Sequence, residues 1–141
     1  MSDVGGAPSR LLRPHGWLAP SGYSEGVVVP PGGRQVVLAG QIGWNPLTAR
    51  VETDVLSEQV RRALQNIVTL LAEAGAEPKH LVRLTWFITN RAEYIAARRE
   101  IGQVYRDILG RHFPAMSVVV VVGLIEERAK VEIEATAVVP V

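Results

Sequence analysis

Apolar and polar residues of this chain alternate with two different periods, and the helical period is clearest between residues 54 and 74. Val60, Leu64, Ile67 and Leu71 recur at helical spacing, and Gly75 supplies a stop signal directly after them. The pattern predicts an amphipathic helix that begins at about residue 54 or 57 and buries one face.

A second helix is predicted after Asn90. Asn90 and Glu93 have the spacing of a capping box, and Ile101 and Val104 continue at helical spacing. We expect Phe113-Pro114 to end this segment, because proline cannot continue a helix.

The period of two, which is typical of strands, appears in several other segments. Strands are predicted over residues 27–29, 35–42, 81–89, 116–122 and 131–137, with a further short strand within 48–53. The first two flank Pro30-Pro31-Gly32-Gly33, which predicts a hairpin. This order of elements indicates an α+β or α/β domain with a mixed sheet.

The apolar run from Val118 to Val122 bears on whether the protein forms an oligomer. Two helices can cover only one face of such a sheet, yet consecutive apolar residues of a strand point to both faces. An uncovered apolar face usually marks an interface. We therefore expect a homo-oligomer in which the open sheet faces pack on one another.

The N-terminal segment differs in composition from the rest. Residues 1–22 are rich in Gly, Pro and Ser and show neither period, so we expect an irregular arm before a single domain over residues 23–141. The start of the chain shows no secretory signal, and the longest apolar run is far shorter than a membrane span. A cytoplasmic protein with no membrane association is the expectation.

Composition excludes several chemistries. The 141 residues include no cysteine, which removes thiol catalysis, disulfides and cysteine-type zinc sites. The formal net charge of +1 makes nucleic acid an improbable partner. His15, His80 and His112 lack ligand spacing, and no glycine-rich phosphate loop is present, so neither a metal nor a cofactor is expected.

Glu132 is the best single candidate for chemistry. It lies with Lys130 and Glu134 on the polar side of an alternating strand, so its carboxylate should point away from the helices and toward the predicted interface. The alternative is a structural carboxylate that pairs with Lys130 or with an arginine across the interface.

Motifs spread along nearly the whole chain resemble the RidA/YjgF family of enamine/imine deaminases. They are Tyr23-Ser24-Glu25-Gly26, Ala39-Gly40-Gln41-Ile42, the helix from Glu58-Gln59 to Ala63-Leu64-Gln65-Asn66-Ile67, Phe113-Pro114-Ala115-Met116-Ser117 and Val131-Glu132-Ile133-Glu134-Ala135. The resemblance implies an α+β, chorismate-mutase-like fold with a mixed sheet and two helices packed on one face. It also implies a homotrimer with small-molecule clefts between subunits.

The resemblance also assigns roles to residues. It implies that Glu132 orients and deprotonates a water for attack on a C=N carbon. It favours Tyr23 as a residue that closes the cleft, and Gln41 is retained from the family pattern. Trp44, at a strand end after this motif, is either a ligand contact or a surface-capping aromatic residue.

Several positions depart from the family pattern. Met116 stands where family members normally carry an arginine that grips the substrate carboxylate. Ala39 replaces a usual serine, Val118 a common cysteine, and Gly102 an asparagine in an alignment interrupted by a shorter connection. We expect Met116 to line an apolar pocket rather than fill core, and ordinary 2-imino acids to bind poorly.

Two functions follow from these observations. The first is a hydrolytic deaminase of a reactive enamine, imine or related metabolite that lacks the usual carboxylate recognition, with the substrate between Met116 and Glu132. The alternative is a non-catalytic small-molecule-binding or regulatory trimer that keeps the cleft. A third reading, ribonuclease activity as reported for some family members, is disfavoured by the near-neutral charge and the lack of an arginine and aromatic stripe.

Overall fold

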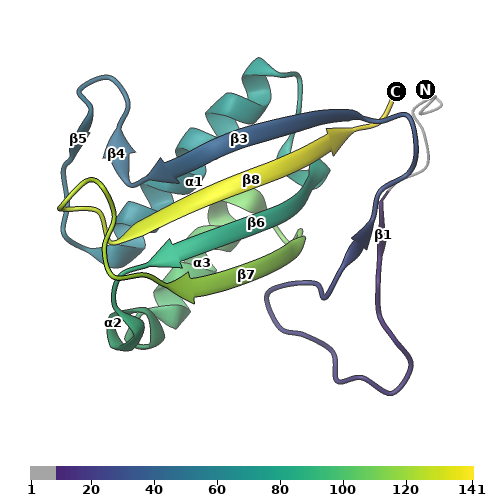
Figure 1. Ribbon diagram of the computed structural model, residues 1–141, viewed down its shortest axis with the longest axis horizontal. Coiled ribbons are helices and arrows are strands. Elements are labelled where there is room, and N and C mark those ends of the chain that lie inside the picture. Colours follow the sequence, from purple (N-terminus) through teal and green to yellow (C-terminus); the bar gives the residue numbers. More distant parts are fainter. Residues whose placement is uncertain (1–8) are drawn as a thin grey trace.

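The computed structural model describes residues 9–141 and has two layers, a four-stranded sheet and helices packed on one of its faces (Figure 1). The predicted α+β class, the mixed sheet and the coverage of one face by helices are confirmed. The first eight residues of the predicted arm lie outside the described residues.

The elements follow the predicted order, except that two short strands, at Arg10–Leu11 and Trp44–Asn45, were not predicted and the second helix is divided. The elements are β1 (Arg10–Leu11), β2 (Val27–Val28), β3 (Arg34–Ile42), β4 (Trp44–Asn45), β5 (Arg50–Val51), α1 (Leu56–Glu73), a 3-10 turn (Pro78–His80), β6 (Leu81–Ile88), α2 (Arg91–Ala96), α3 (Arg98–Leu109), β7 (Ala115–Val120) and β8 (Val131–Val139).

The strand order of the main sheet is β3-β8-β6-β7. β8 pairs antiparallel with both β3 and β6, whereas β7 runs parallel to β6 at the edge. Side chains that face the helices form the core with the apolar stripe of α1, whose members Val60, Leu64, Ile67 and Leu71 are fully buried. The helical periodicity of the sequence therefore identified the buried face of α1 correctly.

The predicted hairpin between residues 27–29 and 35–42 is wrong. β2 pairs antiparallel with β1 in the arm, and β3 instead enters the sheet beside β8. Pro30 and Pro31 have no N–H to donate to a ladder, and Gly32 turns the chain with a φ of 84°. The two segments therefore part at this turn instead of pairing.

The predicted second helix is divided. α2 ends at Ala96, Ala97 separates the two helices with φ of −96° and ψ of 4°, and α3 starts at Arg98. Asn90 caps α2 as expected, because its side chain accepts the N–H of Glu93. The end of α3 was predicted too late: Gly110, with a φ of 73°, ends it before Phe113-Pro114 is reached.

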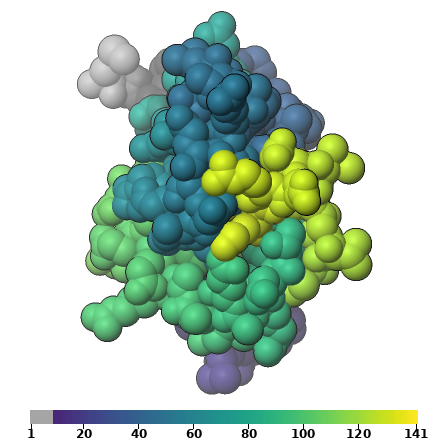
Figure 2. All heavy atoms as spheres, turned by 90° about the vertical axis from the view of Figure 1, so that its left-hand side faces the viewer, coloured from purple at the N-terminus to yellow at the C-terminus, as the bar shows by residue number. Residues whose placement is uncertain are grey.

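Gln59 joins two segments that are distant in sequence. Its fully buried side chain donates from Nε2 to the carbonyls of Thr53 at 2.8 Å and Arg128 at 3.1 Å, and its Oε1 accepts the N–H of Lys130 at 2.8 Å. The connection before β8 is thereby fixed to α1. Figure 2 shows residues of this connection, in yellow, lying against blue residues of the β4–α1 region.

The arm reaches the sheet through Ser24. Its N–H donates to the carbonyl of Pro114 at 3.0 Å, its Oγ donates to the carbonyl of Phe113, and it forms a parallel bridge with Ala115. The remainder of the arm projects beside the sheet (Figure 1). Ser24 therefore sets the position of its neighbour Tyr23 relative to β7.

Edge strand β7 is exposed on both faces. Val118 points to the helix side and is 37% exposed, and Val119 points to the open side and is 42% exposed. On the open face, Val37 of β3 is 73% exposed and Phe87 of β6 is partly exposed. The single chain thus leaves uncovered the apolar positions that the sequence analysis assigned to an interface.

Candidate functional site

The register of the sheet places Met116 and Glu132, which the sequence analysis put on either side of one substrate, on different faces. Met116 lies opposite Leu84, which is buried under the helices, so Met116 faces the helix layer. Glu132 lies opposite Phe87 on the open face, in a row that continues to Val119. Within one protomer, Met116 and Glu132 are on opposite faces of the sheet and cannot hold one ligand between them.

Glu132 has a defined environment on the open face. A β-bulge interrupts β3 between Leu38 and Gln41, and at Gly40 a Cβ atom would lie only 2.7 Å from Cγ of Glu132. The glutamate side chain therefore lies against the Gly40 backbone, a close approach that only glycine permits. Among residues 9–141, the Glu132 carboxylate has neither a hydrogen-bond donor nor an ion-pair partner.

Lys130 does not pair with Glu132. Its Nζ lies 2.8 Å from Oε1 of Glu93 on α2, and both side chains are about one-third exposed. The alternative in which Lys130 neutralises Glu132 is therefore not realised within the protomer, and the Glu132 carboxylate remains available to a proton or a water molecule.

A pocket of about 950 Å³ opens on the other side of the sheet. Its walls are the arm between residues 11 and 24, the inner side of α2 and α3, the loop 111–113 and the helix-facing side of β7. We call this the arm–helix pocket. It contains four positions singled out from sequence, Tyr23, Gly102, Met116 and Val118.

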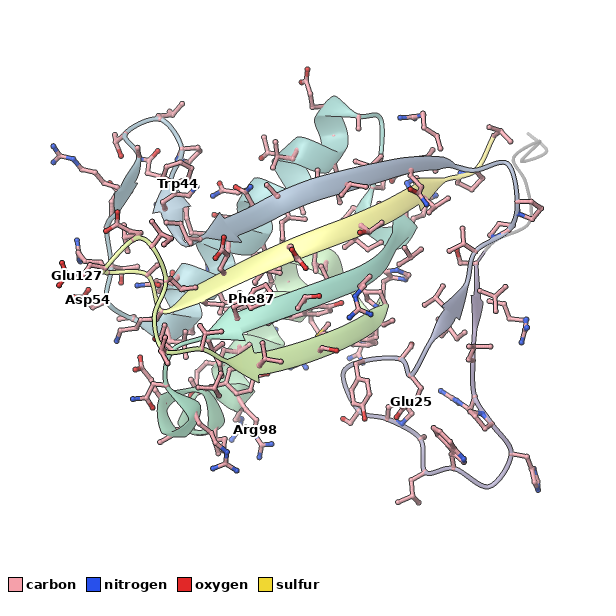
Figure 3. The ribbon with its side chains drawn as sticks, in the orientation of Figure 1. Glu25, Trp44, Asp54, Phe87, Arg98 and Glu127 are labelled. Carbon is pink, nitrogen blue, oxygen red and sulfur yellow. The ribbon has the colours of Figure 1, made fainter. Side chains whose placement is uncertain are left out.

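Four arginines line the arm–helix pocket, namely Arg13, Arg98, Arg106 and Arg111, and none of its described lining residues is acidic. Among residues 9–141, none of these four forms an ion pair. Figure 3 shows Arg98, the first residue of α3, below the sheet. The pocket therefore carries a positive charge that the near-neutral total of the chain conceals.

Aromatic residues form much of the remaining wall. The rings of Tyr105 and Phe113 stack at a centroid distance of 5.4 Å, and the Tyr105 hydroxyl donates to the carbonyl of His112 at 2.6 Å. Burial raises the pKa of Tyr105 well above its usual value. Burial also raises the pKa of Tyr94, against the opposing effect of Arg98. Both phenols thus stay neutral donors at physiological pH.

Tyr23, at the mouth of the pocket, is exposed, and its hydroxyl donates to Oε1 of Glu25 at 3.3 Å. The negative charge of Glu25 raises the pKa of Tyr23. Tyr23 lines the pocket, and its role as an aromatic residue that closes a cleft stays a prediction.

Comparison with known proteins agrees with this architecture. A family model described as Endoribonuclease L-PSP matches residues 17–139. A protein of the conserved Rid family, YyfB from Yersinia pestis, has a solved structure that superposes with a TM-score of 0.81 at 31% identity, covering 94% of this chain and 100% of that chain. The chain belongs to the RidA/YjgF family.

Two further RidA/YjgF relatives have informative names. The 2-iminobutanoate/2-iminopropanoate deaminase of Dermatophagoides farinae is 31% identical over 134 residues, which are 94% of this chain and 98% of that protein. The structure of Escherichia coli TdcF with bound serine superposes with a TM-score of 0.64 at 30% identity, covering 92% of this chain and 98% of that chain.

Three predicted site residues of this RidA/YjgF protein lie away from the arm–helix pocket. Ala39 and Gln41 flank Gly40 in the bulge of β3, and the Gln41 amide donates to the Ala39 carbonyl at 3.2 Å. Trp44 forms β4, where its carbonyl accepts from Asn66 of α1 at 3.1 Å. Figure 3 shows Trp44 at the end of β3, remote from Arg98. Ala39 is exposed beside Gly40, which contacts Glu132, whereas Gln41 lies opposite Ile133, whose side chain is buried on the helix side of the sheet.

His80 and His112 have structural contacts. His80 Nδ1 accepts the N–H of Glu77 at 2.9 Å, and His112 Nε2 lies 2.7 Å from the carbonyl of Leu81. In the described part of the chain, no group of three His, Asp or Glu side chains gathers in a way that could hold a metal ion. Over the same residues, no helix combines the length and apolarity needed to cross a membrane.

The sequence analysis missed the arginines and the function of Ser24. Arg98, Gly102 and Arg106 have i, i+4, i+8 spacing, which places them along one side of α3. That spacing was the available signal. For Ser24 no local signal exists, because its partners lie at residues 113–115.

Proposed function

We propose that this RidA/YjgF protein is a hydrolytic deaminase of reactive enamines or imines, with Glu132 as the group that activates water. The observation that carries the proposal is the Glu132 carboxylate, which lies against Gly40 on the open sheet face with no ion-pair partner among residues 9–141. The relationship to a 2-iminobutanoate/2-iminopropanoate deaminase over 94% of the chain supports the same reaction class.

The chemistry follows from the carboxylate. The Glu132 carboxylate would take a proton from water as the water oxygen attacks the C=N carbon, and the same proton would pass to the nitrogen. Collapse of the resulting carbinolamine releases ammonia and leaves a carbonyl compound. Each turnover consumes one imine and one water, and it requires no redox partner.

The active form proposed here is a homotrimer with its clefts between subunits. The separation of Met116 and Glu132 within a protomer supports this, because a second chain could bring its open-face Glu132 to the pocket side of the first. The exposed Val37, Phe87 and Val119 on the open face also favour association. The ligand would then contact Tyr23, Met116 and Val118 of one subunit and Ala39 and Glu132 of the next. Trp44 stays either a ligand contact or a surface cap.

Ammonia release tests the proposal. A panel of enzymatically generated imines and enamines, with and without a carboxylate, is offered to the wild type, Glu132→Gln and Glu134→Gln. Glu134 lies two residues away on the same strand and the same open face, so its variant is a matched control. We expect Glu132→Gln to lower the rate by about 10²-fold or more, the usual contribution of a general base, while Glu134→Gln stays near wild type. Equal rates for all three proteins would refute the role of Glu132.

The alternative is a non-catalytic ligand-binding trimer. Its supporting observation is Met116, which faces the arm–helix pocket where the family resemblance implies an arginine. This alternative predicts saturable binding of a small molecule that is recovered unchanged. Turnover of the bound compound by the wild type would eliminate it.

A further inference from the structure

The family resemblance implies that Met116 takes the place of an arginine, yet the arm–helix pocket is lined by four other arginines and by no carboxylate. Arg98 and Arg106 come from α3, Arg13 from the arm and Arg111 from the loop that follows α3. Three separate segments thus contribute arginines to one cavity.

The geometry of α3 directs one of these cations into the cavity. Arg106 Nη1 lies 3.3 Å from where a Cβ of Gly102 would stand, and Gly102 itself lines the pocket. Because Gly102 has no side chain, the guanidinium can lie along the helix surface. Its Nη2 donates to Gln103 at 3.3 Å, which leaves its other N–H groups for a ligand.

The neighbouring carboxylates are engaged elsewhere. Asp107 accepts from Gln103 Nε2 at 2.8 Å and lies 3.9 Å from Arg61 of α1. Glu93 pairs with Lys130 at 2.8 Å. Within residues 9–141, no carboxylate forms an ion pair with the pocket arginines, so their guanidinium groups are open to an anionic ligand.

We propose that the arm–helix pocket binds an organic dianion with an aromatic or apolar ring, held through Arg98, Arg106 and Arg111. The inference rests on the proposed function, because it names the ligand class of the same cleft. Several guanidinium groups around one cavity favour more than one negative charge, since each forms charge-assisted, often bidentate bonds to carboxylate or phosphate oxygens.

The rest of the ligand follows from the walls. Tyr94, the stacked pair of Tyr105 and Phe113, and Met116 offer ring faces and apolar bulk beside the arginines. The volume of about 950 Å³ exceeds what a two- or three-carbon imino acid would fill. The pocket therefore suits a larger substrate. Its anionic groups would bind the pocket arginines instead of an arginine at position 116.

Calorimetric titration of the intact protein tests this binding without reference to turnover. The probes are isophthalate and phenyl phosphate as dianions, benzoate as a monoanion and benzyl alcohol as a neutral ring. We expect both dianions to bind at least about tenfold more tightly than benzoate, with an affinity that falls as salt rises. If only one dianion shows this preference, the result assigns the site to carboxylate or to phosphate recognition.

Arginine variants locate the site. Arg98→Gln, Arg106→Gln and Arg111→Gln should each weaken dianion binding by about tenfold, as expected for loss of one charge-assisted contact. Arg99→Gln is the matched control, because Arg99 is equally an exposed residue of α3 but does not line the pocket. It should bind as the wild type does.

Two results would overturn the inference: equal affinities for benzoate and the dianions, or equal losses in Arg99→Gln and the pocket variants. Neither depends on ammonia release. A protein that turns over imines but binds no dianion would refute this inference alone, and one that binds dianions without any turnover would refute only the deaminase proposal.

Discussion

The side chain of Glu132 lies against the backbone of Gly40, so close that a Cβ at position 40 would stand 2.7 Å from Cδ of the glutamate. This contact fixes the direction of the carboxylate without a hydrogen bond to it. The orientation of Glu132, the proposed general base, thus depends on glycine at position 40 of the neighbouring strand, because a side chain there would occupy the same space.

Gly40→Ala is therefore expected to displace Glu132. The added methyl group should destabilise the fold by about 1–3 kcal/mol, the usual cost of overpacking, and should lower the rate of ammonia release together with stability. Urea unfolding and the imine assay measure the two effects. Gly123→Ala is the control, because no atom lies within 4 Å of its Cβ position, and it should change stability by less than about 0.5 kcal/mol.

Gln59 is expected to be important for stability. Gln59→Leu leaves the N–H of Lys130 and the carbonyls of Thr53 and Arg128 without their partners, which should cost about 2–4 kcal/mol. Gln65→Leu, at an exposed position of the same helix, should be nearly neutral in the same denaturation experiment. Similar stabilities for the two variants would contradict this role of Gln59.

The ion pair between Lys130 and Glu93 is expected to contribute little. Both side chains are about one-third exposed, so solvent screens their attraction. A double-mutant cycle with Lys130→Met and Glu93→Gln should give a coupling below about 1 kcal/mol that declines with salt. If Lys130→Met instead abolished ammonia release, Lys130 would be a partner of Glu132 after all.

His80 is expected to make stability depend on pH. Burial, with Lys79 adding to the effect, lowers the pKa of His80 below its ordinary value of 6.5, and protonation would remove the Nδ1 acceptor of the Glu77 N–H. As the pH falls below about 6.5, the unfolded chain takes up this proton first, so stability is full above that value and is lost as the pH falls through the folded pKa. An NMR titration of the imidazole should show a midpoint below 6.5, and Lys79→Met should raise it. A midpoint at or above 6.5 would contradict the assignment.

The open sheet face is expected to be the oligomer interface. Val119→Lys places a charge beside Phe87 and should convert the proposed trimer to a monomer in sedimentation experiments, with loss of ammonia release because the divided site is then incomplete. Leu70→Lys, on the outer side of α1, is a control of similar exposure and should keep the wild-type mass. A Val119→Lys protein with unchanged mass would exclude this face.

Local patterns predicted most of the fold because they depend on neighbours in sequence. The stripe of α1, the alternation of β6 and β8, and the cap at Asn90 were all visible as periods or spacings. The hairpin between residues 27 and 42 was wrong for the opposite reason. The choice of partner for β2 depends on Arg10–Leu11 in the arm, and no local pattern records that pairing.

The candidate site shows the same division. The sequence by itself determined that Glu132 is a polar residue on an alternating strand. The replacement of an arginine by Met116 is what the family resemblance implies, and it stays a prediction. Only the tertiary structure decided that these two residues lie on opposite faces and that four arginines from distant segments meet in one pocket. The physical reason is that strand register and the docking of the arm at Ser24 depend on residues far apart in sequence. These long-range contacts decide which face Glu132 occupies and which arginines line the pocket.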